Sequence, residues 1–227
     1  MKKVVIGMSG GMDSATLLAF LLSQEFEVHC CSFTYGSKHN QYERQAVIQL
    51  INYYGYFEMK DAPVILHTFN LEEVFKDFTS ALLKSGGPIP EGHYESANMI
   101  QTVVPGRNMI FASIMAGLAE SIGAELIALG VHAGDHAIYP DCRPAFIDSL
   151  NETIKYSSEN KVSVLTPFLF DNKTTILLQG LKLLVPYHLT RTCYKDQKNS
   201  CGKCGSCQER LEAFANCGIK DPITYEK

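Results

Sequence analysis

Ser9-Gly10-Gly11-Met12-Asp13-Ser14 joins an apolar run to a helix-forming run near the start of the chain. Val4-Val5-Ile6 precedes it with the β-branched residues of a buried strand, and residues 15–22 (Ala-Thr-Leu-Leu-Ala-Phe-Leu-Leu) follow it. Two adjacent glycines let the backbone approach an anion, amides at a helix start lack partners, and two serine hydroxyls add donors. The junction therefore predicts a strand, a phosphate-binding loop and a helix.

Outward from this junction, apolar strands and helical patterns continue to alternate. We expect strands at 28–33, 64–69, 125–131 and 162–165, and helices at 41–54, 71–85, 108–122, 145–158, from the cap Asn172 to 184, and 208–216. The segment 86–98, rich in glycine, proline and polar residues, suggests a lid. The pattern predicts an α/β protein with a parallel five-stranded Rossmann-like sheet flanked by helices, and one domain over residues 1–227.

The loop lacks the Gly-x-x-x-x-Gly-Lys-Ser/Thr pattern of γ-phosphate transferases, and so it lacks their phosphate-binding lysine. It resembles the PP-loop of ATP pyrophosphatases, which implies that pyrophosphate leaves and AMP passes to an acceptor oxygen. Asp13 is then a candidate partner of Mg²⁺, directly or through water. A glycine turn that merely starts a helix is the structural alternative. The expected ATP-binding residues are Met8, Ser9, Gly10, Gly11, Met12, Asp13, Ser14, Ala15, Thr16, Leu17 and Leu18.

Four of the eight cysteines form a Cys-x7-Cys-x2-Cys-x2-Cys array, namely Cys193, Cys201, Cys204 and Cys207. Four thiolates give tetrahedral Zn²⁺ a closed shell, so the array predicts a structural zinc site in a C-terminal segment, residues 191–217. An iron–sulfur cluster is the rival interpretation, but its usual fourth cysteine is missing from Gln208-Glu209-Arg210. We expect Cys30, Cys31, Cys142 and Cys217 to be small buried side chains.

The charge and hydrophobicity of the chain indicate which kinds of molecule it binds. The 227 residues carry a formal charge of −4, are 46% hydrophobic and contain no block of five or six like charges, so nothing indicates direct binding to nucleic acid or to a membrane. Polar residues interrupt the first apolar run too early for a signal peptide, and the run from Met109 to Ala119 is too short to span a bilayer. We expect a soluble, cytoplasmic protein that acts on small molecules.

Further motifs make the chain resemble, over nearly its whole length, the family of 7-cyano-7-deazaguanine synthases. They are the loop at 9–14, Phe33-Thr34-Tyr35-Gly36 with His39, Val104-Pro105-Gly106-Arg107-Asn108, Tyr139-Pro140-Asp141-Cys142-Arg143, and Thr192-Cys193-Tyr194 with the cysteine array. The resemblance implies a ligase that adenylates 7-carboxy-7-deazaguanine with ATP, lets ammonia displace AMP, and adenylates the amide again to reach the nitrile. It is also our reason to expect a homodimer.

The same resemblance implies residue roles. Two anions must meet in the site, so Mg²⁺ and fixed cations are needed, and the expected catalytic residues are Asp13, Arg107, Arg143 and Lys173. The expected substrate-binding residues are Tyr35, His39, Arg107, Asp135 and Asp141, and His132 and His136 follow the same strand as Asp135. Structural roles are the alternative for these cations: a loop contact for Arg107, a pair with Asp141 for Arg143, and a solvated surface position for Lys173.

The chain also departs from the family pattern. Where the family usually has Asp-Tyr-Gly-Gln-Arg-His, this chain has Thr34-Tyr35-Gly36-Ser37-Lys38-His39. Where the family usually has Ser-Gly, this chain has Ala137-Ile138, and Asn172 replaces a usual aspartate. These changes leave open an enzyme that stops at 7-amido-7-deazaguanine. Two further alternatives are a PP-loop enzyme that thiolates tRNA, which predicts a basic face and a reactive cysteine pair, and a nucleotide-binding protein without catalysis.

Overall fold

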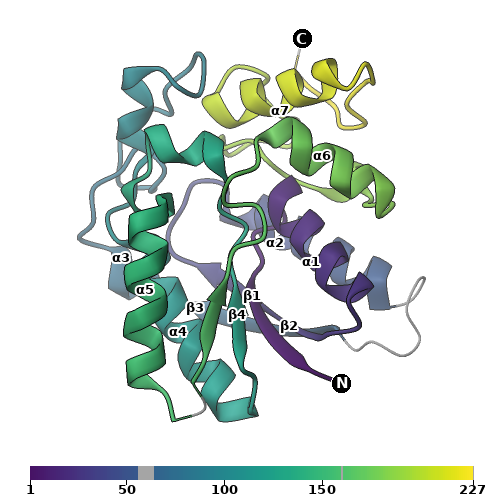
Figure 1. Cartoon of the computed structure of the whole chain (residues 1–227). Helices are drawn as coiled ribbons and strands as arrows, with labels where there is room; N and C mark the ends of the chain where they lie inside the picture. Colours follow the sequence, from purple (N-terminus) through teal and green to yellow (C-terminus); the bar gives the residue numbers. More distant parts are fainter. Residues whose placement is uncertain (56–63, 160, 227) are drawn as a thin grey trace.

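A parallel sheet forms the centre of the computed structural model, which describes residues 1–55, 64–159 and 161–226 (Figure 1). Within these ranges the sheet has five strands in the order β3-β2-β1-β4-β5. They are β1 (Lys3–Gly7), β2 (Glu27–Thr34), β3 (Val64–Asn70), β4 (Leu126–Ala128) and β5 (Ser163–Leu165), and every pairing is parallel. The expected fold class and all five expected strands are confirmed.

Helices cover both faces of the sheet (Figure 1). The helices are α1 (Met12–Ser23), α2 (Asn40–Tyr53), α3 (Glu72–Phe75), α4 (Arg107–Ile122), α5 (Pro144–Ser157), α6 (Lys173–Lys182) and α7 (Gly205–Asn216). Short 3₁₀ turns lie at Ala97–Thr102, Ala133–Ala137, Pro140–Cys142 and Tyr187–Leu189. Two hydrophobic clusters divide the interior, one beneath α1, α2 and α6 and the other beneath α4 and α5.

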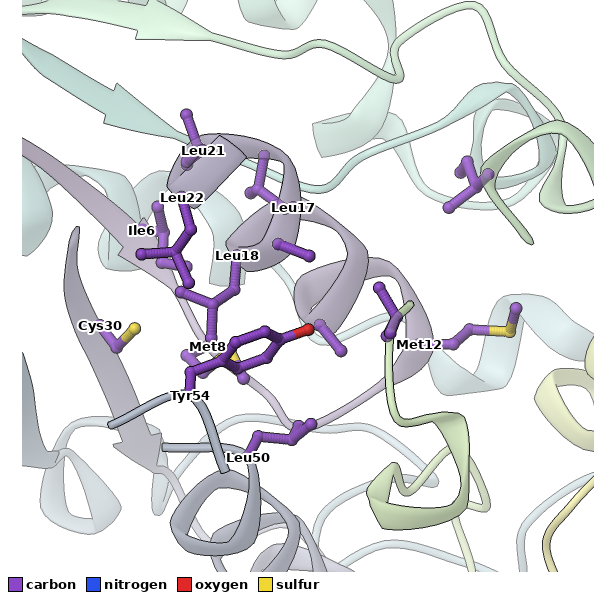
Figure 2. Packing of buried hydrophobic residues seen from close by; sticks show 14 of the residues in the cluster. Ile6, Met8, Met12, Leu17, Leu18, Leu21, Leu22, Cys30, Leu50 and Tyr54 are labelled. Carbon is purple, nitrogen blue, oxygen red and sulfur yellow. The ribbon is translucent and has the colours of Figure 1, made fainter. Parts of the chain in front are cut away.

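The central strand β1 explains the apolar run at the N-terminus. Val4 and Ile6 enter the first cluster and Val5 enters the second, and all three are fully buried. A parallel strand with helices on both faces has no solvated side, so it needs apolar residues without alternation. Figure 2 shows part of the first cluster, where α1 side chains such as Leu18 lie with Leu50 and Tyr54.

Strand order reverses at β1, because β2 lies on one side of it and β4 on the other. In an open parallel sheet, such a reversal leaves a crevice outside the carboxyl ends of the strands, where ligands bind. The Ser9–Ser14 loop follows β1 at this edge, and Gly130 follows β4 beside it. A Cβ on Gly130 would lie 3.6 Å from the Asp13 backbone, so the two loops approach closely.

The expected helix at 71–85 is wrong beyond Phe75, where α3 ends. Contacts with distant segments replace the helical hydrogen bonds. The Lys38 N–H donates to the Leu82 carbonyl, the Lys84 N–H to Gly36, and the Ala81 N–H to Gln101. A backbone already paired in this way cannot also form a helical ladder.

Element boundaries also differ from expectation at two sites that matter for function. The strand expected at 125–131 ends at Ala128, which frees the following residues to line a cavity. The closing helix, expected from 208, begins at Gly205, because Cys204 lies at its N-cap. The predicted cap Asn172 is confirmed, since its Oδ1 accepts from the Thr175 N–H at 2.9 Å.

No helix among the described residues combines the length and the apolar character needed to cross a bilayer. The most apolar helices, α1 and α4, instead bury Leu17, Leu18, Ala112 and Met115 in the two clusters.

Arg210 fastens α7 and the chain end to the rest of the molecule. Its side chain is fully buried, and it donates to both carboxylate oxygens of Asp221 at 2.7 and 2.9 Å. It also donates to Thr190 Oγ1, Thr192 Oγ1 and the Tyr187 carbonyl. Such bidentate bonds fix both partners in one geometry.

Arg210→Ala should lower the free energy of unfolding by about 3 to 5 kcal/mol, because it leaves the buried Asp221 carboxylate without its counter-charge. Chemical denaturation of the two proteins measures this difference. The control Lys155→Ala removes the exposed ion pair with Glu152 and should change the stability by less than about 1 kcal/mol. Equal stability of Arg210→Ala and the wild type would refute this anchoring role.

Candidate functional site

The Ser9–Ser14 loop has the geometry of an anion cradle. Gly10 has φ +80°, and a Cβ there would lie 2.8 Å from Ala46 Cβ, so only glycine fits. Gly11 lies at the N-cap of α1 and has no side chain to occupy the first amides of the helix. Ser9 Oγ and Ser14 Oγ lie 3.2 Å apart beside them. Backbone amides and serine hydroxyls gathered at one helix start suit a phosphate.

Lys173, the first residue of α6, lies between two carboxylates and an imidazole beside this loop. Its Nζ is 2.6 Å from Asp13 Oδ2, 3.2 Å from Glu209 Oε2 and 2.8 Å from His132 Nε2. The side chain is only 7% exposed, so the solvated alternative for Lys173 does not hold. A buried ammonium needs such carboxylates to remain charged.

The charges of this cluster support one another. Burial opposes ionisation of Asp13, but Lys173 and His132 outweigh it and hold the pKa of Asp13 below its usual value. Burial likewise opposes the charge of Lys173, yet Asp13 and Glu209 raise the pKa of Lys173 overall. For Glu209, burial prevails over the attraction of Lys173 and raises its pKa. Asp13 and Lys173 are therefore a charged pair at neutral pH.

A cavity of about 250 Å³ brings most of the predicted residues together. Those that line it are Met8, Ser9, Gly11, Met12, Asp13, Ser14, Tyr35, His39, Arg107, Asp135 and Lys173. The other predicted ATP-binding residues do not line the cavity. Gly10 gives the loop its backbone conformation, Thr16 Oγ1 lies 2.8 Å from Tyr187 Oη, and Ala15, Leu17 and Leu18 lie in the core. Residues after β2 and residues from α4 also line the cavity.

Arg107 supplies a second cation, which is half-buried. Its Nη1 lies 3.4 Å from Tyr35 Oη, and its Cζ is 5.9 Å from the centre of the Tyr35 ring. Burial opposes its charge, but the surrounding tyrosine oxygens and Asp141 raise the pKa of Arg107 overall. Burial also raises the pKa of Tyr139 and Tyr194, which line the same cavity as neutral hydroxyls.

Asp141 and Arg143 do not line this cavity. Asp141 Oδ2 accepts from the Asn108 N–H at 3.0 Å, and its carbonyl accepts from Asn108 Nδ2, so it holds the start of α4 in place. Arg143 Nε donates to the His136 carbonyl at 2.9 Å. Both residues support neighbouring backbone, and direct roles for them stay predictions.

Sequence reasoning missed two carboxylates in the cavity. Glu209 comes from the first half of α7, and Glu43 Oε1 lies 3.3 Å from His39 Nε2. No local signal marks either one, because each is an ordinary acidic residue in an amphipathic helix. The expected lid at 86–98 contacts the C-terminal segment instead: the Gly92 N–H donates to the Lys203 carbonyl, and none of these residues lines the cavity.

The four array cysteines converge as predicted. Their Sγ atoms all lie within 4.8 Å of one another, and all four side chains are buried. Backbone N–H groups of Lys195 and Cys201 donate to Cys193 Sγ, and those of Lys203 and Cys204 donate to Cys201 Sγ. Amides that point at sulfur stabilise thiolates, so this donor set fits a metal such as zinc in a closed four-sulfur shell.

Comparison with known proteins gives consistent matches. The family model described as queuosine biosynthesis protein QueC matches residues 3–218. A 7-cyano-7-deazaguanine synthase from Pseudoalteromonas atlantica is 41% identical, covering 99% of this chain and 99% of its own. Synthases of the same name from Hahella chejuensis (42% identical, 96% of this chain, 90% of that protein) and Caldicellulosiruptor saccharolyticus (41%, 99% and 96%) also match.

Among solved structures, NMN synthetase from Francisella tularensis has a TM-score of 0.50 with 12% sequence identity, and the match covers 96% of this chain and 77% of that one. At this identity the likeness concerns the fold alone.

Purified protein should contain one zinc ion per chain, and Cys204→Ala should lose it, because three thiolates leave the tetrahedral shell open. Elemental analysis by mass spectrometry measures the zinc, and thermal unfolding should show a lower midpoint for the variant. Cys217→Ala, at a cysteine outside the cluster, is the matched control and should keep its zinc. Iron in place of zinc would instead favour the rival iron–sulfur interpretation.

Proposed function

The chain belongs to the 7-cyano-7-deazaguanine synthase family, and we propose that it uses ATP to convert 7-carboxy-7-deazaguanine and ammonia into 7-cyano-7-deazaguanine. In this scheme the carboxylate attacks the α-phosphorus of ATP, pyrophosphate leaves, and ammonia displaces AMP to give the amide. A second adenylation, on the amide oxygen, releases a second pyrophosphate, and loss of AMP and a proton then gives the nitrile. The enzyme is then a carbon–nitrogen ligase.

One observation carries this proposal: an anion-binding loop and two cations, the buried Lys173 and the half-buried Arg107, share one cavity. Both ATP and the carboxylate are anionic, so their approach costs electrostatic energy unless fixed positive groups offset it. We assign the phosphates to the Ser9–Ser14 loop and Lys173, and the acid substrate to the side of Arg107, Tyr35, His39 and Asp135. Holding the two anions in line for attack supplies much of the acceleration.

Magnesium ion fits beside the loop. Asp13 Oδ1 is buried and has no hydrogen-bond partner, while Oδ2 is engaged by Lys173. An orphaned carboxylate oxygen next to a phosphate cradle suits Mg²⁺ or one of its waters. Magnesium, when bound, would offset charge on the phosphates. Asp13 thus has one oxygen for the lysine and one for the metal.

Zinc in the four-cysteine site would act as a cross-link. Four thiolates complete its coordination shell and leave no position for a substrate. The chain's own residues then perform the chemistry, and the metal holds the segment that carries α7. We also propose that residues 1–227 form one catalytic domain. We propose that it works in the cytoplasm and does not contact nucleic acid directly. The homodimer stays a prediction.

We propose the nitrile, and not the amide, as the product. Of the positions that depart from the family pattern, Thr34 lines the cavity, whereas Ser37, Lys38, Ala137, Ile138 and Asn172 do not. Lys38 Nζ instead donates to the carbonyls of Ala81 and Gly86, and Asn172 caps α6. Most of the departures therefore change the surroundings of the site and leave its lining intact.

Thiolation of tRNA finds less support. That reaction predicts a reactive cysteine pair near the loop, but Cys142 is the only described cysteine that lines the cavity. Burial raises the pKa of the Cys142 thiol, which keeps it protonated and unreactive. In the proposed structure of the site, all four array cysteines coordinate the metal, so none of them is a free thiol for sulfur transfer.

Incubation of the purified protein with ATP, Mg²⁺, ammonium and 7-carboxy-7-deazaguanine should yield the nitrile by mass spectrometry. Asp13→Asn should slow pyrophosphate release by roughly 100-fold or more, since it removes the charge that binds Mg²⁺ and Lys173. The exposed Asp148→Asn on α5 is the control and should keep full activity.

Three results would contradict parts of this proposal. An amide that accumulates without nitrile would make the amide the product. Wild-type pyrophosphate release from Asp13→Asn would reject the assignment of the loop. Unchanged acid with intact ATP would reject the reaction.

A further inference from the structure

Glu209 connects the metal segment to the proposed nucleotide site. Helix α7 starts directly after Cys204, carries Cys207 near its beginning, and places Glu209 two residues further on. The Glu209 side chain is only 11% exposed and lines the cavity, although the proposed chemistry assigns it no task. Burying a carboxylate is costly unless it has a partner.

That partner is Lys173. Three elements meet at Lys173 Nζ: α1 through Asp13, the turn after β4 through His132, and α7 through Glu209. The neighbouring turn leaves room for this arrangement, because a Cβ on Gly134 would lie 2.5 Å from Glu209 Oε1 and 2.9 Å from His132 Cε1. Glu209 is thus held by packing as well as by charge.

The two carboxylates that hold Lys173 differ in where they lie relative to the phosphate loop. Asp13 is in the phosphate loop, and its charge is shared once a metal ion binds to its free oxygen. Glu209 comes from α7, outside the phosphate loop; like Asp13, it faces both Lys173 and His132. If Asp13 were the only carboxylate beside Lys173, the flexible lysine side chain would be held less firmly once Asp13 also binds a metal ion.

We infer that Glu209 is the positioning residue for Lys173: it keeps the ammonium directed at the phosphates of ATP and so ties the nucleotide site to the four-cysteine segment. This inference rests on the proposed use of ATP. It gives the C-terminal segment a part in nucleotide binding through Lys173, in addition to its structural role.

Binding of Mg²⁺·ATP, measured by titration calorimetry without the acid substrate, tests this inference. Glu209→Gln should weaken binding on the order of tenfold, since it removes one charged partner of a buried lysine. Under turnover, KM for ATP should rise more than kcat falls. Glu212→Gln is the matched control, because it lies on the same helix with its carboxylate exposed near His93, and it should bind ATP as the wild type does.

A double-mutant cycle separates positioning from general damage to the fold. If Glu209 acts through Lys173, the Lys173→Met variant and the Lys173→Met, Glu209→Gln variant should bind ATP equally weakly. Additive losses would overturn the inference. All variants are compared at equal zinc content, measured by mass spectrometry. If Glu209→Gln does not fold, Glu209→Asp keeps the charge but shortens the reach, and it should weaken ATP binding only when Lys173 is present.

The failure of this inference and the failure of the proposed function give different results. A wild-type protein that binds no ATP overturns both. A wild-type protein that binds ATP no more tightly than Glu209→Gln overturns the positioning role alone.

Discussion

The buried charge of Lys173 is the constraint on which the rest of the site depends. An ammonium removed from water must be matched by carboxylates, and this chain brings them from the two ends of its sequence, Asp13 and Glu209. The start of α6, the phosphate loop and the C-terminal helix must therefore lie together. That point coincides with the reversal of strand order beside β1, where a parallel sheet already leaves a crevice.

Local patterns in the sequence were enough to predict the parts of the molecule that are built locally. The β1–loop–α1 unit follows from consecutive residues, since buried strands, glycine turns and apolar helices each have their own signature. The cysteine cluster was predictable because the spacing of the last three cysteines already limits how they can be arranged in space. The convergence of Tyr35, His39, Arg107 and Lys173 needed the family resemblance as well.

Contacts between distant segments account for what could not be predicted. Residues 80–84 look helical, yet Lys38 and Gly36 supply their hydrogen-bond partners from the loop after β2. Glu209 is an unremarkable acid in a helix until α6 brings Lys173 to it. Asp141 stays a predicted substrate ligand, but its bond from the backbone N–H of Asn108 had no signal in the sequence. Patterns in a single sequence do not reveal which residues far apart along the chain contact each other.

The central position of β1 has a consequence for synthesis on the ribosome. β1 emerges first, but its second neighbour pairs Val4 with Leu126, so one edge stays open until half of the chain has been made. Lys173 and Glu209 appear later still. Asp13 is therefore made long before either of the groups that share its charge environment, and the loop also waits for the Arg191 N–H that donates to the Gly10 carbonyl, so we expect the phosphate site to form only when the chain is nearly complete.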